Sequence, residues 1–239
     1  MQLFYCPDIS SGTPATLDHD ESRHAVRVLR MRVGDSIDVT DGRGTLYHCR
    51  VVVADEKACV VDCETAVVQN AGAWLHLAVA PTKNPSRMEW LVEKAVEVGV
   101  GEITLLQCDH SERSFLKTER LTKIAVSAMK QSLHCLLPVI NPVTPMAEWM
   151  DRAVGGDEIQ KFIAHCDALS QRTPLAAALL PRRDAVVMIG PEGDFSDGEV
   201  AAALRQGFSP VSLGPSRLRT ETAAIYVACA FNLVNDLQP

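Results

Sequence analysis

The first seventy residues alternate apolar and polar positions over short stretches, the pattern of half-buried β-strands. The alternation is clearest at 36–40 (SIDVT), and the dipeptide Asp41-Gly42 that follows favours a tight turn. Short strands joined by tight turns are typical of a small barrel. We therefore predict a small β domain over residues 1–70, with strands at 3–5, 36–40, 46–53 and 58–61 and a short helix at 22–29.

From about residue 74 the pattern changes to short apolar runs that alternate with longer amphipathic segments. Ser86 with Glu89, and Ser196 with Glu199, have the spacing of a capping box and each predict the start of a helix. Strands that alternate with helices form a mostly parallel sheet covered on both faces. We predict an α/β domain over residues 74–239, with strands at 75–80, 102–107, 161–166, 185–189 and 210–213 and helices near 86–98, 121–129, 174–180, 196–207 and 220–235.

Composition is that of a globular protein, with 47% hydrophobic and 22% charged residues. The longest apolar run, 223–234, is too short to cross a membrane. The N-terminus lacks the basic and apolar regions of a signal peptide. We expect a soluble cytoplasmic protein with reduced thiols, no metal site, and neither a membrane nor DNA as a partner.

The net charge of −7 argues against broad affinity for nucleic acid. Two segments nevertheless carry a local excess of positive charge. Residues 21–50 hold six arginines against four acidic residues, and residues 111–130 hold five basic residues against two acidic ones. Either segment can be a solvated surface or part of a binding site for an acidic partner.

Two strand exits carry the candidate chemistry, because ligands of parallel sheets bind at the carboxyl ends of strands. The first exit is GPEG at 190–193, where two glycines allow a close approach of the backbone or a positive φ. The second is the loop at 213–222, which holds Arg219 and Glu221 at the start of a helix that is apolar on nearly every side. Such charges must be paired or used in chemistry, so either an ordinary turn and ion pair or a ligand site is consistent with the pattern.

The chain resembles the SPOUT class of methyltransferases, and within it the bacterial family that methylates N3 of a uridine in small-subunit ribosomal RNA. The resemblance runs from about residue 20 to the C-terminus. It rests on HAVRVLRMRVGD at 24–35, RMEW at 87–90, KAVEVGV at 94–100, GPEG at 190–193 and LRTETA at 218–223. The chain differs from the usual motifs at Asp194, where a glycine is common, and at Ser216-Arg217.

The resemblance implies a PUA-like barrel followed by a domain with a deep trefoil knot at about 160–239. S-adenosylmethionine would be the cofactor, and the protein would be a homodimer, which would bury the apolar last helix. The knot loops would bind the cofactor through Gly190, Pro191, Glu192, Gly193, Leu213, Gly214, Ser216 and Leu218.

We further expect Arg219 to stabilise charge on the uracil oxygens, and Glu221 to orient Arg219 or to assist proton removal. The RNA partner would be small-subunit ribosomal RNA, free or within the assembled subunit. Its phosphates would be contacted by Arg23, Arg27, Arg30 and Arg32, with Lys83 and Arg87 at the cleft between the domains.

Two other functions remain open at this point. One is a SPOUT ribose 2′-O methyltransferase that acts on transfer or ribosomal RNA. The other is a catalytically inactive RNA-binding factor in ribosome assembly. The position of the methyl group in the product would distinguish the ribose 2′-O activity from methylation at N3 of uridine. Binding of S-adenosylmethionine would test whether the protein is an inactive factor.

Overall fold

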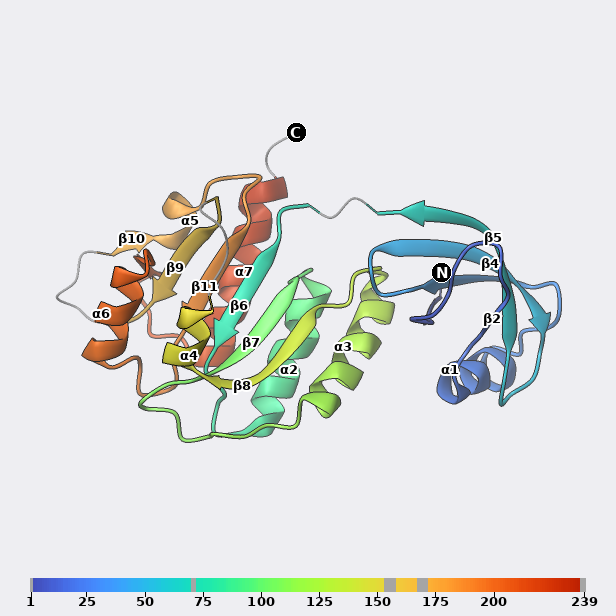
Figure 1. Ribbon diagram of the computed structural model, residues 1–239, viewed down its shortest axis with the longest axis horizontal. Coiled ribbons are helices and arrows are strands. Elements are labelled where there is room, and N and C mark those ends of the chain that lie inside the picture. Colours follow the sequence, from blue (N-terminus) through green and yellow to red (C-terminus); the bar gives the residue numbers. More distant parts are fainter. Residues whose placement is uncertain (1, 70–71, 153–157, 167–171, 237–239) are drawn as a thin grey trace. The chain divides into compact units, whose positions relative to one another are not determined.

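The computed structural model describes residues 2–69, 72–152, 158–166 and 172–236, and these form two compact units (Figure 1). The first unit holds the described residues before Gly72 together with Val126–Leu137. The second holds Gly72–Ala125 and the described residues from Pro138 onward. Residues 126–137, which the sequence pattern places in the α/β domain, thus cluster with the first unit.

The first unit is built on a five-stranded sheet in the order β1-β3-β4-β5-β2. Neighbouring strands pair antiparallel, except for β1 and β3, which are parallel. Its core is formed by apolar side chains such as Phe4, Val39 and Val61. The predicted N-terminal β domain is confirmed, with strands β1 (Leu3–Tyr5), β2 (Ala15–Thr16), β3 (Ser36–Thr40), β4 (Thr45–Val53) and β5 (Val60–Val68).

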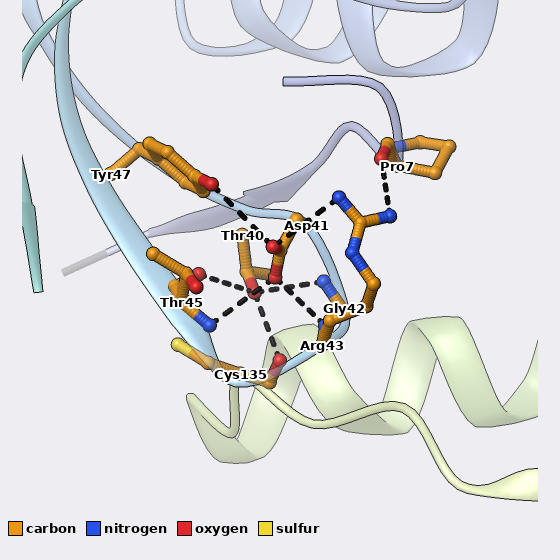
Figure 2. Close-up of polar contacts among 8 residues, drawn as sticks. All are labelled: Pro7, Thr40, Asp41, Gly42, Arg43, Thr45, Tyr47 and Cys135. Atoms are coloured by element: carbon orange, nitrogen blue, oxygen red, sulfur yellow. Dashed lines mark hydrogen bonds and ion pairs between the residues drawn. The ribbon is translucent and has the colours of Figure 1, made fainter. Parts of the chain in front are cut away.

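The predicted turn at Asp41-Gly42 joins β3 to β4 and also holds residues that follow helix α3 (Thr118–Ser132) (Figure 2). The Asp41 carboxylate accepts from the backbone N–H of Arg43 at 2.8 Å, and Gly42 has a φ of +73°. The Thr40 hydroxyl donates to the Cys135 carbonyl at 3.1 Å, and the Gly44 N–H donates to the same oxygen at 2.8 Å. These bonds explain why residues 126–137 belong to the first unit.

The short helix predicted at 22–29 is two elements. Helix α1 (His19–Arg23) begins at Asp18, whose side chain accepts from the Glu21 N–H at 2.8 Å. A π-helical turn, η1 (His24–Val28), follows directly. In a π-helical turn each hydrogen bond spans five residues instead of four, and such turns are rare. Because this turn interrupts the 3.6-residue period of an α-helix, the sequence pattern predicted the wrong bounds for the helix.

The second unit is an α/β domain, as predicted. Seven strands lie in the order β10-β12-β9-β11-β6-β7-β8, and every neighbouring pair is parallel. The strands are β6 (Leu75–Val79), β7 (Glu102–Gln107), β8 (Val139–Pro145), β9 (Gln160–Ala164), β10 (Thr173–Pro174), β11 (Ala185–Ile189) and β12 (Ser209–Ser212). The sequence pattern missed β8 and β10.

Helices lie on both faces of this sheet (Figure 1). Trp149 and Ala203, from α4 and α6, pack on one face against β6 and β11, while α2 and α7 pack against each other on the opposite face. The helices of the second unit are α2 (Pro85–Glu97), α4 (Met146–Asp151), α5 (Leu175–Ala178), α6 (Asp197–Arg205) and α7 (Thr220–Asp236), while α3 begins in this unit and ends in the first. Within the described ranges, every helix falls short of the length and hydropathy that a membrane crossing needs.

The two predicted capping boxes have different outcomes. At α6 the Ser196 side chain accepts from the Glu199 N–H while Glu199 accepts from the Ser196 N–H, as predicted. At α2 the prediction is wrong, because Asn84 is the cap and accepts from the Ser86 N–H at 3.0 Å. Pro85 occupies the first helical position, so the helix starts two residues earlier than a cap at Ser86 would place it, and Glu89 pairs with Arg120.

Candidate active site

A cavity of about 340 Å³ lies at the carboxyl ends of β9, β11 and β12. These three strands are neighbours in the sheet, so their exits meet at one edge. The volume is within the range of small-molecule sites, roughly 300–1,000 Å³. We call it the carboxyl-edge cavity; it is lined by Ala164, His165, Cys166, Arg172, Ile189, Gly190, Pro191, Glu192, Asp194, Val211, Leu213, Gly214, Ser216, Arg217, Leu218, Arg219, Thr220 and Ala223.

Both predicted strand exits contribute to this cavity. Seven of the eight predicted cofactor residues line it, and Gly193 does not. A side chain at Gly193 would come within 3.0 Å of His110 Cβ, so this glycine is explained by a close contact with the loop after β7. The His110 ring donates from Nδ1 to the carbonyls of Gly193 and Asp194, at 3.1 and 3.0 Å, which holds the loop at its far end.

The two glycines of the first loop do not adopt the positive φ that the sequence allowed. Packing leaves little room for a side chain at Gly190, because an added Cβ would lie 3.1 Å from the Phe195 ring. The positive φ occurs instead at Asp194, at +64°. In the second loop Gly214 has a φ of +107°, which glycine adopts without strain.

Asp194 stabilises its own strained backbone and connects two strand exits. Its Oδ1 accepts from the Phe195 N–H at 2.9 Å, and its Oδ2 accepts from the Cys166 N–H at 2.7 Å. Aspartate tolerates the left-handed region because its short side chain bonds the nearby backbone in this way. The departure from the usual glycine therefore adds a brace between the exits of β11 and β9.

The sequence reasoning missed the third wall of the cavity. Ala164, His165 and Cys166 leave β9 without a glycine or a charged motif, so only the position of this strand between β11 and β12 identifies them. A second omission is Thr220, the first residue of α7. Its hydroxyl donates to the Gly190 carbonyl at 3.1 Å and so joins the two predicted loops.

The two predicted catalytic residues face different surroundings. Arg219 is exposed and lines the cavity. Glu221 is buried, and its Oε1 lies 3.5 Å from Nε of Arg87. Its Oε2 is buried and has no hydrogen-bond partner among the described residues. Arg219 precedes α7, whereas Glu221 lies in the first turn of this helix. The two side chains are therefore in different surroundings although only one residue separates them in the sequence.

The predicted RNA contacts divide between the two units. Arg23, Arg27, Arg30 and Arg32 are all exposed and lie in or just after α1 and η1 of the first unit. Arg30 has a φ of +59°, which ends the π-helical turn. The four arginines lie within ten residues of one another, so they place four positive charges on one short segment of an acidic chain.

Lys83 and Arg87 belong to the second unit, and both are ion-paired. Lys83 Nζ lies 2.8 Å from Glu112 Oε2, and Arg87 pairs with Glu221. The Glu112 carboxylate raises the pKa of Lys83 and keeps it charged. The backbone N–H of Lys83 also donates to Oε1 of Glu192 at 3.2 Å, so Lys83 contacts the loop at 190–193.

The carboxyl-edge cavity combines backbone loops with the exposed guanidinium groups of Arg217 and Arg219 and the partly buried one of Arg172. Its lining is mostly small or apolar, which suits an uncharged ring system, while the loop N–H and carbonyl groups can recognise polar edges. Arg219 can stabilise negative charge that develops on a second reactant at the cavity mouth. The arrangement fits a transferase that binds a small donor beside a larger acceptor.

Comparison with known proteins agrees with this geometry. Residues 69–232 match the model of a family described as RNA methyltransferase domain, and residues 17–63 match an RNA methyltransferase PUA domain. A solved structure described as a probable rRNA-methyltransferase from Porphyromonas gingivalis is 40% identical, with a TM-score of 0.91 and complete coverage of both chains.

Two further relatives carry more specific descriptions. The structure of a ribosomal RNA small subunit methyltransferase E from Neisseria gonorrhoeae, bound to S-adenosyl methionine, is 27% identical with a TM-score of 0.82 and full coverage of both chains. A ribosomal RNA small subunit methyltransferase E from Bacillus subtilis is 27% identical over 96% of this chain and 93% of its own length.

Proposed function

Because the chain belongs to the RNA methyltransferase domain family, we propose that it methylates N3 of a specific uridine in small-subunit ribosomal RNA, with S-adenosylmethionine as donor. The observation that carries this proposal is the carboxyl-edge cavity, which gathers seven predicted cofactor residues and Arg219. The relatives that span nearly the whole chain support the cofactor and the RNA class. The N3 position rests on the sequence motifs.

The two loops would hold the cofactor through their backbone groups, at Gly190 to Glu192 and at Leu213 to Leu218. When bound, this cofactor supplies an activated methyl group on a sulfonium. The chain itself then has to place the acceptor nitrogen in line and exclude water. The trefoil knot remains a prediction and would bring these two loops together.

Arg219 is proposed to stabilise the negative charge that forms on the uracil oxygens as N3 loses its proton. Since Oε2 of Glu221 is buried outside the cavity lining, we assign Glu221 a positioning role through Arg87. The pair would hold the Arg87 guanidinium, which is about one-third exposed, toward an RNA phosphate. Uracil N3 lies on the Watson–Crick edge, so the target base must be unpaired or flipped out.

The exposed arginines of the first unit are proposed to contact RNA phosphates. Each contact that is removed lowers the salt dependence of binding by about one unit of slope. Replacement of Arg23, Arg27, Arg30 and Arg32 by glutamine should therefore weaken binding and flatten its dependence on salt. Unchanged affinity for small-subunit ribosomal RNA would exclude this role.

We also propose a cytoplasmic homodimer. The exposed faces of α2 and α7 carry Trp90, Tyr226 and Leu233, with 43%, 43% and 60% of their surface accessible. Large apolar side chains that gather on a packed helix pair are typical of a subunit interface. Sedimentation equilibrium of the purified protein tests this state directly.

The function is tested by methyl transfer from tritiated S-adenosylmethionine to small ribosomal subunits from cells that lack the protein. The product is digested to nucleosides and separated. Label in 3-methyluridine supports the proposal, and label in a 2′-O-methylated nucleoside replaces it with the ribose activity. Cofactor binding without any label would indicate an inactive assembly factor.

A further inference from the structure

A second concave surface lies at the same edge of the α/β sheet, where α2 and α3 begin. It has a volume of about 420 Å³ and is lined by Pro85, Glu89, Arg113, Phe115, Leu116, Lys117, Arg120 and Leu121. We call it the Phe115 groove. It lies within the second unit and shares no lining residue with the carboxyl-edge cavity.

Phe115 is a large apolar side chain of this groove that is exposed to solvent. It is 67% exposed, on the segment that leads from β7 to α3. Exposure of a phenyl ring to water is unfavourable, and a partner that covers the ring would gain the free energy of burying it. Flat aromatic side chains beside cationic groups are the surfaces on which single-stranded nucleic acids stack their bases.

The charges of the groove favour an anionic partner. Three cations and one carboxylate line it, a formal charge of +2. Arg120 is paired with Glu89, with Nε 2.6 Å from Oε1. Lys117 is exposed and forms no ion pair with any residue that the structure describes. Lys117 directly precedes α3, and Pro85 is the first residue of α2. The N-termini of both helices therefore add partial positive charge to the groove.

Arg113 carries an unused hydrogen-bond donor beside Phe115. Its Nη2 donates to the Lys83 carbonyl at 2.8 Å. Its Nε is buried and has no hydrogen-bond partner among the described residues. Because this Nε has almost no accessible surface, Arg113 contributes to the groove through the positive charge of its guanidinium rather than through this donor.

The groove is connected to the carboxyl-edge cavity through one residue. Lys83 accepts from Arg113 through its carbonyl and donates through its N–H to Glu192, which lines the cavity. An RNA strand whose target base lies at the mouth of the carboxyl-edge cavity would therefore extend along the sheet edge that carries the groove.

We propose that the Phe115 groove binds a nucleotide of the single-stranded RNA that flanks the methylated base. Phe115 stacks on the flanking base, and Lys117 and Arg113 contact its phosphate. This inference rests on the proposed RNA substrate and deepens it by adding a substrate contact in the methyltransferase domain.

The test compares Phe115→Ala, Phe115→Trp and Lys117→Gln with Leu204→Ala, a matched loss of an exposed apolar side chain on α6. The substrates are small-subunit ribosomal RNA for equilibrium binding and small ribosomal subunits for kinetics. Phe115→Ala should weaken binding about tenfold, raise KM by a similar factor and leave kcat and S-adenosylmethionine affinity unchanged. Phe115→Trp should bind within about twofold of the wild type, and Lys117→Gln should lower the salt slope by about one.

The outcomes separate this inference from the proposed function. If Phe115→Ala binds and turns over like Leu204→Ala while the wild type forms 3-methyluridine, the groove is not a substrate site and the function stands. If the wild type labels another nucleoside but Phe115→Ala still loses RNA affinity, the groove is confirmed and the N3 assignment fails. Phe115→Leu with full affinity would show that apolar bulk suffices and would exclude stacking.

Discussion

Opposite edges of the seven-stranded sheet carry cavities of similar size and different construction. The carboxyl-edge cavity has a volume of about 340 Å³ and lies where β9, β11 and β12 end. A cavity of about 330 Å³, here called the amino-edge cavity, lies where β6, β7 and β11 begin. The first is lined by loop backbone, and the second by side chains that project from strands, among them His76, Glu102, Thr104 and Asn141.

The polar groups of the amino-edge cavity bond to one another. His76 Nε2 lies 2.8 Å from the Thr104 hydroxyl, and Asn141 donates to Thr104 and to Glu102 at 2.9 and 2.6 Å. In the carboxyl-edge cavity, by contrast, Arg219 has no ion pair among the described residues. Two cavities of similar volume can therefore have different roles. Polar groups that bond to one another stabilise the fold, whereas polar groups without partners can bind a ligand.

The comparison is tested most strongly by Arg219→Ala. Methyl transfer should fall by about 10²–10³-fold, because the proposed role of Arg219 is to stabilise the negative charge that develops on the acceptor. S-adenosylmethionine affinity by calorimetry should stay within about threefold of the wild type. Single-turnover labelling measures the loss, with Arg205→Ala, an exposed arginine at the end of α6, as the matched control. An Arg219→Ala enzyme with normal turnover would remove the main chemical distinction between the two cavities.

The amino-edge cavity should instead control stability through His76. Burial lowers the pKa of His76 from 6.5 to about 4. Between these values the unfolded chain binds a proton that the folded protein does not, so stability falls as the pH falls through this range. The contribution lost by pH 4 is about 3 kcal/mol. Burial raises the pKa of Glu102, whose Oε1 is 3.6 Å from His76, and this acts in the opposite direction.

Urea unfolding of the wild type and of His76→Gln between pH 4 and pH 7 measures this term. Glutamine keeps a hydrogen-bonding side chain but does not titrate, so the variant should lose less stability on acidification. Arg152 lines the same cavity and is the other charged group near this site. Parallel pH profiles of the two proteins would show that His76 is not the group responsible.

Sequence patterns predicted the carboxyl edge better than the amino edge, for a physical reason. A glycine loop after a buried strand is a local feature, and residues from GPEG at 190–193 and from the loop at 213–218 line the carboxyl-edge cavity, with Gly193 as an exception. His76 lies inside an apolar strand, and its hydrogen-bond partner Thr104 is 28 residues away along the chain. Asn141, which donates to Thr104, is a further 37 residues away. Only the parallel register of β6, β7 and β8 brings them together.

The same limit explains the other differences. The division at residue 72 follows a change of period, but residues 126–137 join the first unit through bonds to the turn at Thr40 and Gly44. Arg219 and Glu221 are close in sequence, yet the start of α7 separates their side chains. Pairings across long stretches of chain leave no trace in a local pattern.

Asp194 is the third test, because its side chain braces two exits of the carboxyl-edge cavity. Asp194→Ala loses the bonds to Cys166 and Phe195 and keeps a strained φ of +64°. We expect a loss of about 2 kcal/mol in stability and roughly tenfold weaker S-adenosylmethionine binding. Asp194→Gly also lacks the two hydrogen bonds but has no backbone strain. It should therefore be about 1 kcal/mol more stable than Asp194→Ala and bind S-adenosylmethionine as weakly. Equal affinity in all three proteins would show that the brace does not shape the cavity.

The finest test removes one hydroxyl at each edge while the shape of the side chain is kept. Thr220→Val deletes the bond to the Gly190 carbonyl, and Thr104→Val deletes the contacts with His76 and Asn141. Each should cost about 1 kcal/mol of stability, since each breaks a buried hydrogen bond. Only Thr220→Val should weaken S-adenosylmethionine binding, because its bond joins the two loops that line the carboxyl-edge cavity. Calorimetry and urea unfolding of both variants measure the two quantities independently. Weaker cofactor binding in Thr104→Val as well would mean that the two edges are coupled through the sheet, and the amino-edge cluster would then be part of the site rather than of the fold alone.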